Sequence, residues 1–320
     1  MKKNKYFLLL EGLLAILAVI LGVMIFNSYD DSAVGKIAVI LPDSDSNRWA
    51  SLKYGLKMAA KDQKIDLVIV NTDENLTAKE QVKFLKQAIA QGADGLIVQP
   101  VVGIKAEQLA QIQEQLPLLV VGTGVGNNEE SHQWDSVLPD NYGLGKTLGE
   151  EVLSDYGGDL KDKTIGILSE NKQTKAEKAR LQGFEDAIKT AGAATLWQVT
   201  LSEKASIESV DWLDSLANVN LVVALDDESV ATTADKLKRS VVYGIGHSTE
   251  SMHALDNGNV EALVVPDLFQ MGYESVVNLT GELTHFFASA KQETIDYQVI
   301  RQEDLFSKEN QELLFTMSQN

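Results

Sequence analysis

The feature that most constrains the fold is a regular alternation of short apolar runs with amphipathic stretches. The apolar runs have the length and the continuous hydrophobicity of strands that are buried on both faces. Such strands, when helices separate them, form parallel sheets covered by helices, so the sequence predicts an α/β fold. The expected strands are Lys36–Leu41, Asp66–Val70, Gly95–Val98, Leu118–Val121, Thr164–Leu168, Thr195–Val199, Leu221–Ala224, Val241–Gly244, Ala262–Val265 and Tyr297–Arg301.

Capping signals support the helices that are expected between these strands. Asp73, Asn75 or Thr77 can cap the second helix, because each carries a side-chain oxygen that accepts from free backbone amides. Gly92 and Gly192 follow helices at the position where a left-handed residue ends them. The clearest expected helices are Trp49–Asp62, Ala78–Gln91, Lys175–Ala191 and Ala231–Leu237.

The number of strands indicates two sheets, with the break near Leu138–Asn141. In open parallel sheets, ligands bind beyond the carboxyl ends of the strands. The first strand is followed there by an acidic and polar loop that ends in Arg48 and Trp49. A plain connector needs neither an arginine nor the largest aromatic side chain. The loop is therefore predicted to form part of a ligand site.

Composition excludes several classes of function. The chain has 320 residues and a formal net charge of −18, whereas a nucleic-acid-binding protein needs a basic face for phosphates. It has no cysteine, and its four histidines lie far apart. The sequence therefore shows no zinc, haem or iron–sulfur motif and no catalytic thiol, and we expect no cofactor.

The N-terminus carries the pattern of a membrane anchor. Lys2, Lys3 and Lys5 precede Phe7–Phe26, which is apolar apart from Glu11 and two glycines. About 20 apolar residues span a bilayer core, and positive charge on the short side places that side in the cytoplasm. We expect a cytoplasmic tip and signal-anchor helix over residues 1–27, a linker over 28–35 and an extracytoplasmic remainder. The alternative is a cleavable signal peptide.

Several segments together resemble the type I periplasmic (extracytoplasmic) solute-binding proteins of the ribose- and xylose-binding kind, whose fold is that of the lactose-repressor core. The similar segments include "KIAVILPDSDSNRWASLKYGLKMAAKD", "AIAQGADGLIVQPV" and "VLPDNYGLGKTLGEEVL". Each is weak alone, but their order and spacing follow the family.

The resemblance implies two Rossmann-like lobes joined by three hinge crossovers, near Leu138–Asp140, Pro266–Asp267 and Ile295–Tyr297. The N-terminal lobe would hold residues 36–139 and 267–295. The C-terminal lobe would hold residues 140–266 and 296–320. Such lobes close over a ligand by a hinge motion, which requires no chemical reaction.

The resemblance also implies a set of ligand-binding residues. Lys178 falls where family members carry a ligand-contacting arginine, and Arg180 falls in the neighbouring, more structural position. Trp49 would offer a flat apolar face to a sugar ring, and Arg48 a fork of donors to its hydroxyls. The residues expected at the ligand are Asp45, Ser46, Arg48, Trp49, Gln99, Thr123, Asn141, Lys178, Asp226, His247 and Asp267.

Purely structural roles compete with these assignments. Trp49 could pack into the core beside the first helix, with Arg48 as a solvated helix start. Asp226 and Asp227 could cap the helix Glu228–Leu237, since aspartate is a preferred capping residue.

The chain departs from the family at three sugar-contacting positions. An Asp–Arg pair of the family is Gly122–Thr123 here, an acid is Gly246, and a glutamine is Pro266. The ligand could then be larger, could be held by backbone amides of the glycine-rich loops, or could be a protein.

These features together predict a binding protein and not an enzyme. "GTGVG" at 122–126 does not open a helix, as a dinucleotide site requires, and no nucleophile elbow is present. We expect capture of a small ligand, above all a carbohydrate, and its presentation to the permease of a sugar ABC transporter or to a sensor histidine kinase. One alternative is a receptor for a non-sugar ligand or a protein, with no transport role. Another is an adhesion protein that has lost its ligand.

Overall fold

The computed structural model describes most of the chain after residue 32. The predicted anchor over residues 1–27 lies outside the described residues, as do His132 and His285. Within the part that is described, no helix is both long enough and apolar enough to cross a membrane. The described residues are 33–73, 75–125, 134–170, 174–201, 216–234, 236, 239–284, 292–308 and 310.

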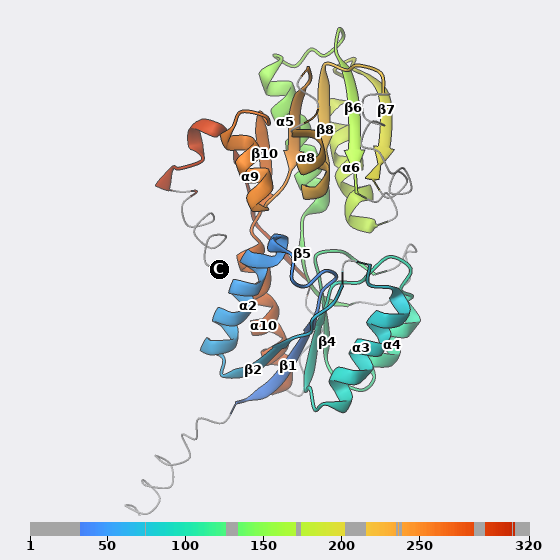
Figure 1. Cartoon of the computed structure of the whole chain (residues 1–320), viewed down its shortest axis with the longest axis vertical. Helices are drawn as coiled ribbons and strands as arrows, with labels where there is room; N and C mark the ends of the chain where they lie inside the picture. The colour runs from blue at the N-terminus through green and yellow to red at the C-terminus, as the bar shows by residue number, and fades with distance from the viewer. Residues whose placement is uncertain are drawn as a thin grey trace, which may run out of the picture. The chain divides into compact units, whose positions relative to one another are not determined.

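The first sheet is parallel throughout and has the order β11-β5-β4-β3-β1-β2. Helices α2 and α10 cover one face, and α3 and α4 cover the other (Figure 1). Its strands are β1 (Gly35–Ile40), β2 (Ile65–Ile69), β3 (Gly95–Val98), β4 (Leu118–Val121), β5 (Asp135–Pro139) and β11 (Gln292–Ile295). Its helices are α2 (Ala50–Asp62), α3 (Ala78–Ala90), α4 (Ala106–Gln113) and α10 (Leu268–Thr284), with a 3-10 turn η1 (Asn47–Trp49) before α2.

The second sheet has the order β12-β10-β9-β8-β6-β7, and only β12 runs antiparallel to its neighbour. Helices α5 and α6 cover one face, and α8 and α9 the other. Its strands are β6 (Thr164–Ser169), β7 (Ala194–Thr200), β8 (Leu221–Ala224), β9 (Val241–Ile245), β10 (Ala262–Pro266) and β12 (Tyr297–Ile300). Its helices are α5 (Asn141–Asp155), α6 (Lys175–Ile188), α8 (Asp227–Ala234) and α9 (Thr249–Asp256), and the turn η3 (Gln302–Asp304) follows.

The chain passes between the two sheets three times, from β5 to α5, from β10 to α10 and from β11 to β12. The predicted two-lobe α/β fold with parallel sheets is therefore confirmed. Strands β5 and β11 were not among the strands expected from the sequence. Their sequences, DSVLP and QETI, lack the long apolar run that marks the other strands, because both lie at the side of the sheet from which the crossovers leave.

Most local signals at the helix ends agree with the structure. Among the three proposed caps of α3, Thr77 is the one used, and it forms a capping box with Glu80. Gly92 has a φ angle of +79° directly after the C-cap of α3, as expected for a left-handed residue that ends a helix. Gly192 also has a positive φ of +81°, but α6 ends at Ile188, so Gly192 lies in the connection to β7 and does not end the helix. Helix α8 starts earlier than predicted, because Asp226 accepts a hydrogen bond from Ser229 N at 2.8 Å.

Helix pairs in both lobes cross at glycines. A Cβ added to Gly55 on α2 would lie 2.1 Å from Phe269 O, and one added to Gly272 on α10 would lie 2.2 Å from Leu52 O. In the second lobe, a Cβ on Gly145 of α5 would lie 1.8 Å from Arg180 O. The helix backbones are therefore in direct contact at these crossings, which leaves no space for any side chain.

Candidate functional site

A cavity of about 1340 Å³ lies where the carboxyl ends of strands from both sheets meet. The first lobe contributes the loops that follow β1, β3 and β4. The second lobe contributes the residues that follow β6, β8 and β9. This is the location predicted for ligands of open parallel sheets. The polar and charged side chains that line it include Ser46, Arg48, Gln99, Thr123, Glu170, Glu177, Arg180, Asp226, Asp227 and His247.

The structure brings most of the predicted site residues together at this cavity, but not all of them. The cavity is lined by Ser46, Arg48, Trp49, Gln99, Thr123, Asp226 and His247. Asp45, Asn141, Lys178 and Asp267 do not line it. Each of these four side chains faces elsewhere for a local reason.

Asp45 is exposed and faces a separate groove beside α2. The neighbouring Ser44 is buried and tied to Thr72, because Thr72 N donates to Ser44 Oγ at 2.9 Å and Ser44 N donates to Thr72 Oγ1 at 3.2 Å. This pairing turns the loop so that Asp45 points away from the cavity. Asp267 instead caps α10, accepting from Gln270 N at 2.9 Å.

Helix α6 presents Arg180 to the cavity and not Lys178. Lys178 is exposed, whereas Arg180 donates from Nε to Asn141 Oδ1 and from Nη1 to Leu225 O, both at 2.8 Å. Asn141 thus orients Arg180 and does not itself line the cavity. Burial lowers the pKa of Arg180, while the charge of Asp226 acts in the opposite direction.

Three polar atoms in the cavity wall are buried and have no hydrogen-bond partner among the described residues. They are Arg48 Nε, Gln99 Oε1 and Thr123 Oγ1. Gln99 Oε1 lies beside Gly122, which has a φ of +72°. A Cβ at this position would lie only 2.6 Å from that oxygen, so the absence of a side chain on Gly122 permits the placement of Gln99. An unpaired buried polar group is costly, so a donor, an acceptor and a hydroxyl together indicate a polar ligand.

Trp49 has a mainly structural position. Its side chain is only 6% exposed and belongs to the core of the first lobe, and Nε1 donates to Pro42 O at 2.9 Å. The guanidinium carbon of Arg48 lies 5.1 Å from the ring centroid. Core packing and this cation–π contact cover most of the surface of the indole ring, so Trp49 has little exposed area for stacking against a sugar.

Contacts between the lobes cross the cavity at Arg48. Its Nη1 lies 3.9 Å from Glu170 Oε1, and its carbonyl oxygen lies 3.1 Å from His247 Nε2. The other ring nitrogen of His247, Nδ1, lies 2.6 Å from Asp227 Oδ2. His247 therefore connects the carboxylate of one lobe with the ligand loop of the other.

The two acids after β8 hold the surrounding loops and have opposite pKa shifts. Burial raises the pKa of Asp226 to about 6, although its oxygens accept from Ser229 N and from Glu170 N. Burial acts on Asp227 in the same direction, but His247 and hydrogen bonds from Ser251 and Ser248 lower the pKa of Asp227 below its ordinary value. Both the capping role and the cavity-lining role of Asp226 are thus realised.

The raised pKa of Asp226 predicts a stability that depends on pH. Because the pKa of Asp226 is higher in the folded than in the unfolded chain, protonation of Asp226 stabilises the fold. This stabilisation is fully present below pH 3.8, the ordinary pKa of aspartate, and is lost as pH rises through about 6. Two pKa units correspond to about 3 kcal/mol. We expect the unfolding free energy of the wild type, measured by urea denaturation, to fall between pH 4 and pH 7 relative to that of Asp226→Asn. Parallel pH curves for the two proteins would contradict this prediction.

The cavity has the chemistry of a binding site for hydroxyl groups. Acidic side chains outnumber basic ones among its described lining residues, and carboxylates accept hydrogen bonds from hydroxyls. Among the described residues, no group of histidines and carboxylates is arranged to hold a metal ion. Glu170 and Glu177 also line the cavity, although neither was among the residues expected there from the sequence. Glu170 could have been found, since it directly follows the strand β6.

Known proteins share this architecture. The galactofuranose-binding protein YtfQ of Escherichia coli (strain K12) is 21% identical over 233 residues, which are 69% of each chain. The structure of GanP, a glucose-galactose binding protein from Geobacillus stearothermophilus, has a TM-score of 0.71 and 22% identity over 85% of this chain and 99% of its own. A chain of the XylFII-LytSN complex has a TM-score of 0.67 and 19% identity over 84% of this chain and 98% of its own.

At these identities the solved structures show a common fold. The family assignment comes from the sequence itself, because the profile of the periplasmic binding protein domain matches residues 37–284. That range includes most of both sheets and every predicted site residue. The chain therefore belongs to the family of periplasmic binding protein domains.

Proposed function

We propose that the chain is an extracytoplasmic solute-binding protein that captures a carbohydrate between its lobes by hinge closure. The observation that carries this proposal is the set of unpartnered buried atoms in the cavity, Arg48 Nε, Gln99 Oε1 and Thr123 Oγ1. A sugar hydroxyl both donates and accepts, so it satisfies each of the three. Contacts to both lobes would favour the closed state.

The relatives support a sugar as the ligand class. YtfQ is named for binding galactofuranose, and GanP for binding glucose and galactose. The cavity volume of about 1340 Å³ exceeds the roughly 300–1,000 Å³ of common small-molecule pockets. Gly122, Gly246 and Pro266 also replace larger polar side chains of the family. Both observations favour a ligand larger than one pentose or hexose.

A membrane partner and a membrane anchor complete the proposal. The apolar run Phe7–Phe26 would tether the chain, with residues from 36 onward outside the cytoplasm. The closed form would then meet the permease of a sugar transporter or the outer part of a sensor kinase. The XylFII-LytSN complex supports a protein partner, since this relative was solved together with one. A sensing role without transport is the second candidate.

Thermal melting of residues 33–320 against monosaccharides, oligosaccharides, polyols, nucleosides and amino acids tests the ligand class. A ligand at 100 times its dissociation constant stabilises the fold by about 2.7 kcal/mol. For a unit of this size that corresponds to a rise in Tm of roughly 5 °C. We expect sugars, and oligosaccharides most of all, to give that rise. A rise with amino acids or nucleosides alone would overturn the carbohydrate assignment.

A variant pair connects the binding to the cavity. Gln99→Ala removes an unpartnered acceptor from the wall, so we expect it to weaken sugar binding about tenfold, a loss of about 1.4 kcal/mol. Gln87→Ala, on the exposed side of α3, is the matched control and should bind as the wild type does. Equal affinity of both variants, measured by calorimetry, would place the ligand elsewhere.

A further inference from the structure

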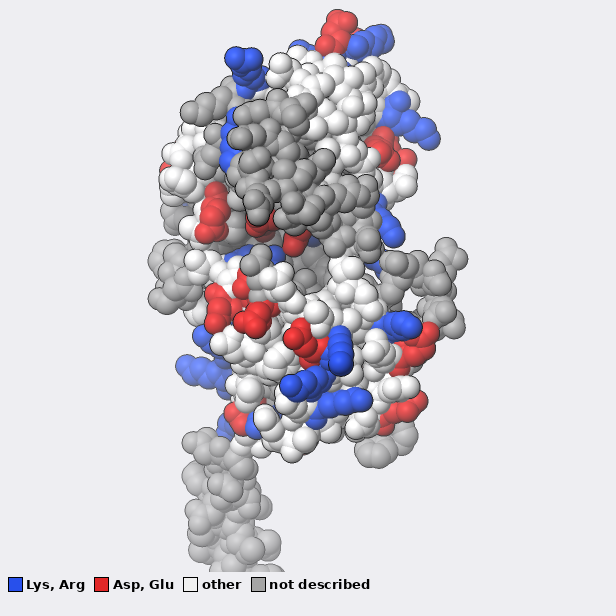
Figure 2. All heavy atoms as spheres, turned by 45° about the vertical axis from the view of Figure 1, so that its right-hand side comes forward, with Lys and Arg blue, Asp and Glu red and all other residues white. Residues whose placement is uncertain are grey.

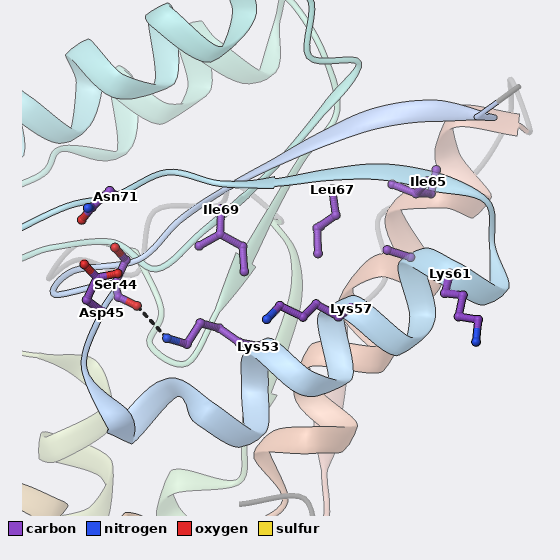
Figure 3. Close-up of a pocket in the computed structure, with 10 residues that line it drawn as sticks. Ser44, Asp45, Lys53, Lys57, Lys61, Ile65, Leu67, Ile69 and Asn71 are labelled. Atoms are coloured by element: carbon purple, nitrogen blue, oxygen red, sulfur yellow. Dashed lines mark hydrogen bonds between the residues drawn. The ribbon is translucent and has the colours of Figure 1, made fainter. Parts of the chain in front are cut away.

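A second concave site of about 560 Å³ lies on the first lobe, between α2 and the edge strand β2. Its floor is apolar and is formed by Ile65, Leu67 and Ile69 of β2. Its wall carries Lys53, Lys57 and Lys61, which follow one another along the same side of α2 (Figure 3). We call this site the lysine groove. It does not share any lining residue with the cavity between the lobes.

The strand that borders the lysine groove has a free edge. β2 is the last strand of its sheet and pairs only with β1 among the described strands. Val70 N donates to Val39 O of β1. Because backbone groups alternate in direction along a strand, the amides and carbonyls of Ile65, Leu67 and Ile69 point away from β1. Their side chains point toward α2 and form the groove floor, so the groove lies directly beside the free edge of the strand.

The three lysines outnumber the one carboxylate that lines the groove, Asp45, and no ion pair to them is found within the described part of the chain. Lys53 donates to the carbonyl oxygen of Ser44 at 3.0 Å, which is a neutral partner. Lys57 and Lys61 are exposed and pair with no carboxylate among the described residues. Like charges four residues apart on a helix repel each other. Three such lysines are unusual in a chain of net charge −18, and negative charge in the groove would offset their repulsion.

From these observations we propose that the lysine groove binds an extended acidic segment of a protein partner, which adds to β2 as a further strand. Backbone hydrogen bonds to β2 provide affinity, and alternate side chains provide specificity in this mode of recognition. Because successive side chains of an added strand point to opposite faces of the sheet, the side chains on the α2 face are the acidic ones. Their carboxylates face Lys57 and Lys61, and their methylene groups cover Leu67 and Ile69. Apolar side chains alternate with them on the other face, so the segment alternates acidic and apolar residues.

Charge excludes a second copy of this chain as the occupant. Two copies that paired through β2 would form an antiparallel strand pair around a two-fold axis perpendicular to the sheet. Such an axis places the two α2 helices on the same face of the joined sheet. The two rows of lysines would then lie side by side and repel each other. A bare anion does not account for the apolar floor or for the free strand edge. Elsewhere, in the view of Figure 2, Lys and Arg side chains are interspersed with Asp and Glu side chains on the described surface.

Hydrogen exchange of the full-length chain with three synthetic peptides tests the proposal. The probes are octapeptides that alternate Glu with Val, Lys with Val, and Glu with Ser. We expect only the Glu/Val peptide to slow exchange of the Leu67 and Ile69 amides, by roughly tenfold. Equal protection by the Lys/Val peptide, or none by any peptide, would refute the acidic segment. Binding to phosphatidylglycerol vesicles without any peptide effect would reassign the groove to a lipid surface.

Substitutions of the exposed lysines separate charge recognition from folding. Lys57→Glu with Lys61→Glu should abolish protection by the Glu/Val peptide, and Lys57→Arg with Lys61→Arg should retain it. Lys83→Glu with Lys86→Glu on α3 changes the net charge equally but away from the groove, and should retain protection. Sugar binding in the cavity serves as an independent readout and should be the same in all three. Loss of protection in the α3 variant would indicate a nonspecific charge effect and contradict the proposal.

Discussion

Replacing Gly272 by alanine is expected to lower the free energy of unfolding by about 2 kcal/mol or more. The new Cβ would lie 2.2 Å from the carbonyl oxygen of Leu52 and 2.9 Å from Leu56 N. These atoms belong to the backbone of α2, which cannot rotate away as a side chain could. The two helices must therefore move apart, and the core that they share with the first sheet loses its packing.

The same substitution at Gly281 is the matched control. Gly281 lies on the same helix, α10, but a Cβ there would meet nothing within 4 Å. Alanine favours a helix over glycine by roughly 0.5–1 kcal/mol, so Gly281→Ala should be neutral or slightly stabilising. Urea denaturation of both variants measures the difference. Equal stability of the two would mean that the crossing of α2 and α10 is not as close as the structure has it.

Replacing Arg180 by lysine is expected to weaken sugar binding about 10- to 100-fold, since hydrogen bonds from charged groups contribute about 1.5–3 kcal/mol. The guanidinium is held by Asn141 and Leu225 at the cavity wall and lies among the acidic groups of the second lobe. Lysine keeps the charge but cannot reproduce the planar fork. Calorimetry with the sugar that gives the largest melting shift measures the loss.

Lys178→Met is the control for this prediction and also decides between two alignments. The family resemblance alone assigns the contact to Lys178, whereas the structure places Lys178 in solvent and Arg180 at the cavity. Lys178→Met should therefore bind sugar with unchanged affinity. If Lys178→Met lost binding while Arg180→Lys kept it, the lysine would be the contact. Melting curves of both variants without ligand show whether each remains folded.

Most of the fold could be predicted because its signals are local. A strand such as β3 is an uninterrupted apolar run, and a helix end such as Gly92 requires a conformation that glycine adopts most easily. Strands β5 and β11 could not be recognised in the same way. Their short and partly polar sequences form strands only because β4 and β5 already offer a sheet edge to pair with.

The candidate site could be located from the sequence but not assigned residue by residue. The rule that ligands bind at carboxyl ends of strands identified the loop after β1 and the acids after β8. It could not show that Ser44 pairs with Thr72 and turns Asp45 away, because those partners come from loops that follow two different strands, β1 and β2. Nor could it show that Trp49 is used by the core and by Arg48.

The sequence by itself determined the class of fold, the division into two sheets and the edge at which the cavity forms. Those properties follow from periodicity, capping and the direction of parallel strands, all of which are local. Only the tertiary structure decided that Arg180 and not Lys178 reaches the cavity, that three polar atoms in its wall lack partners, and that the lysine groove faces a free edge. The reason is physical: the environment of a side chain is set by neighbours that are distant in the chain and meet it only on folding.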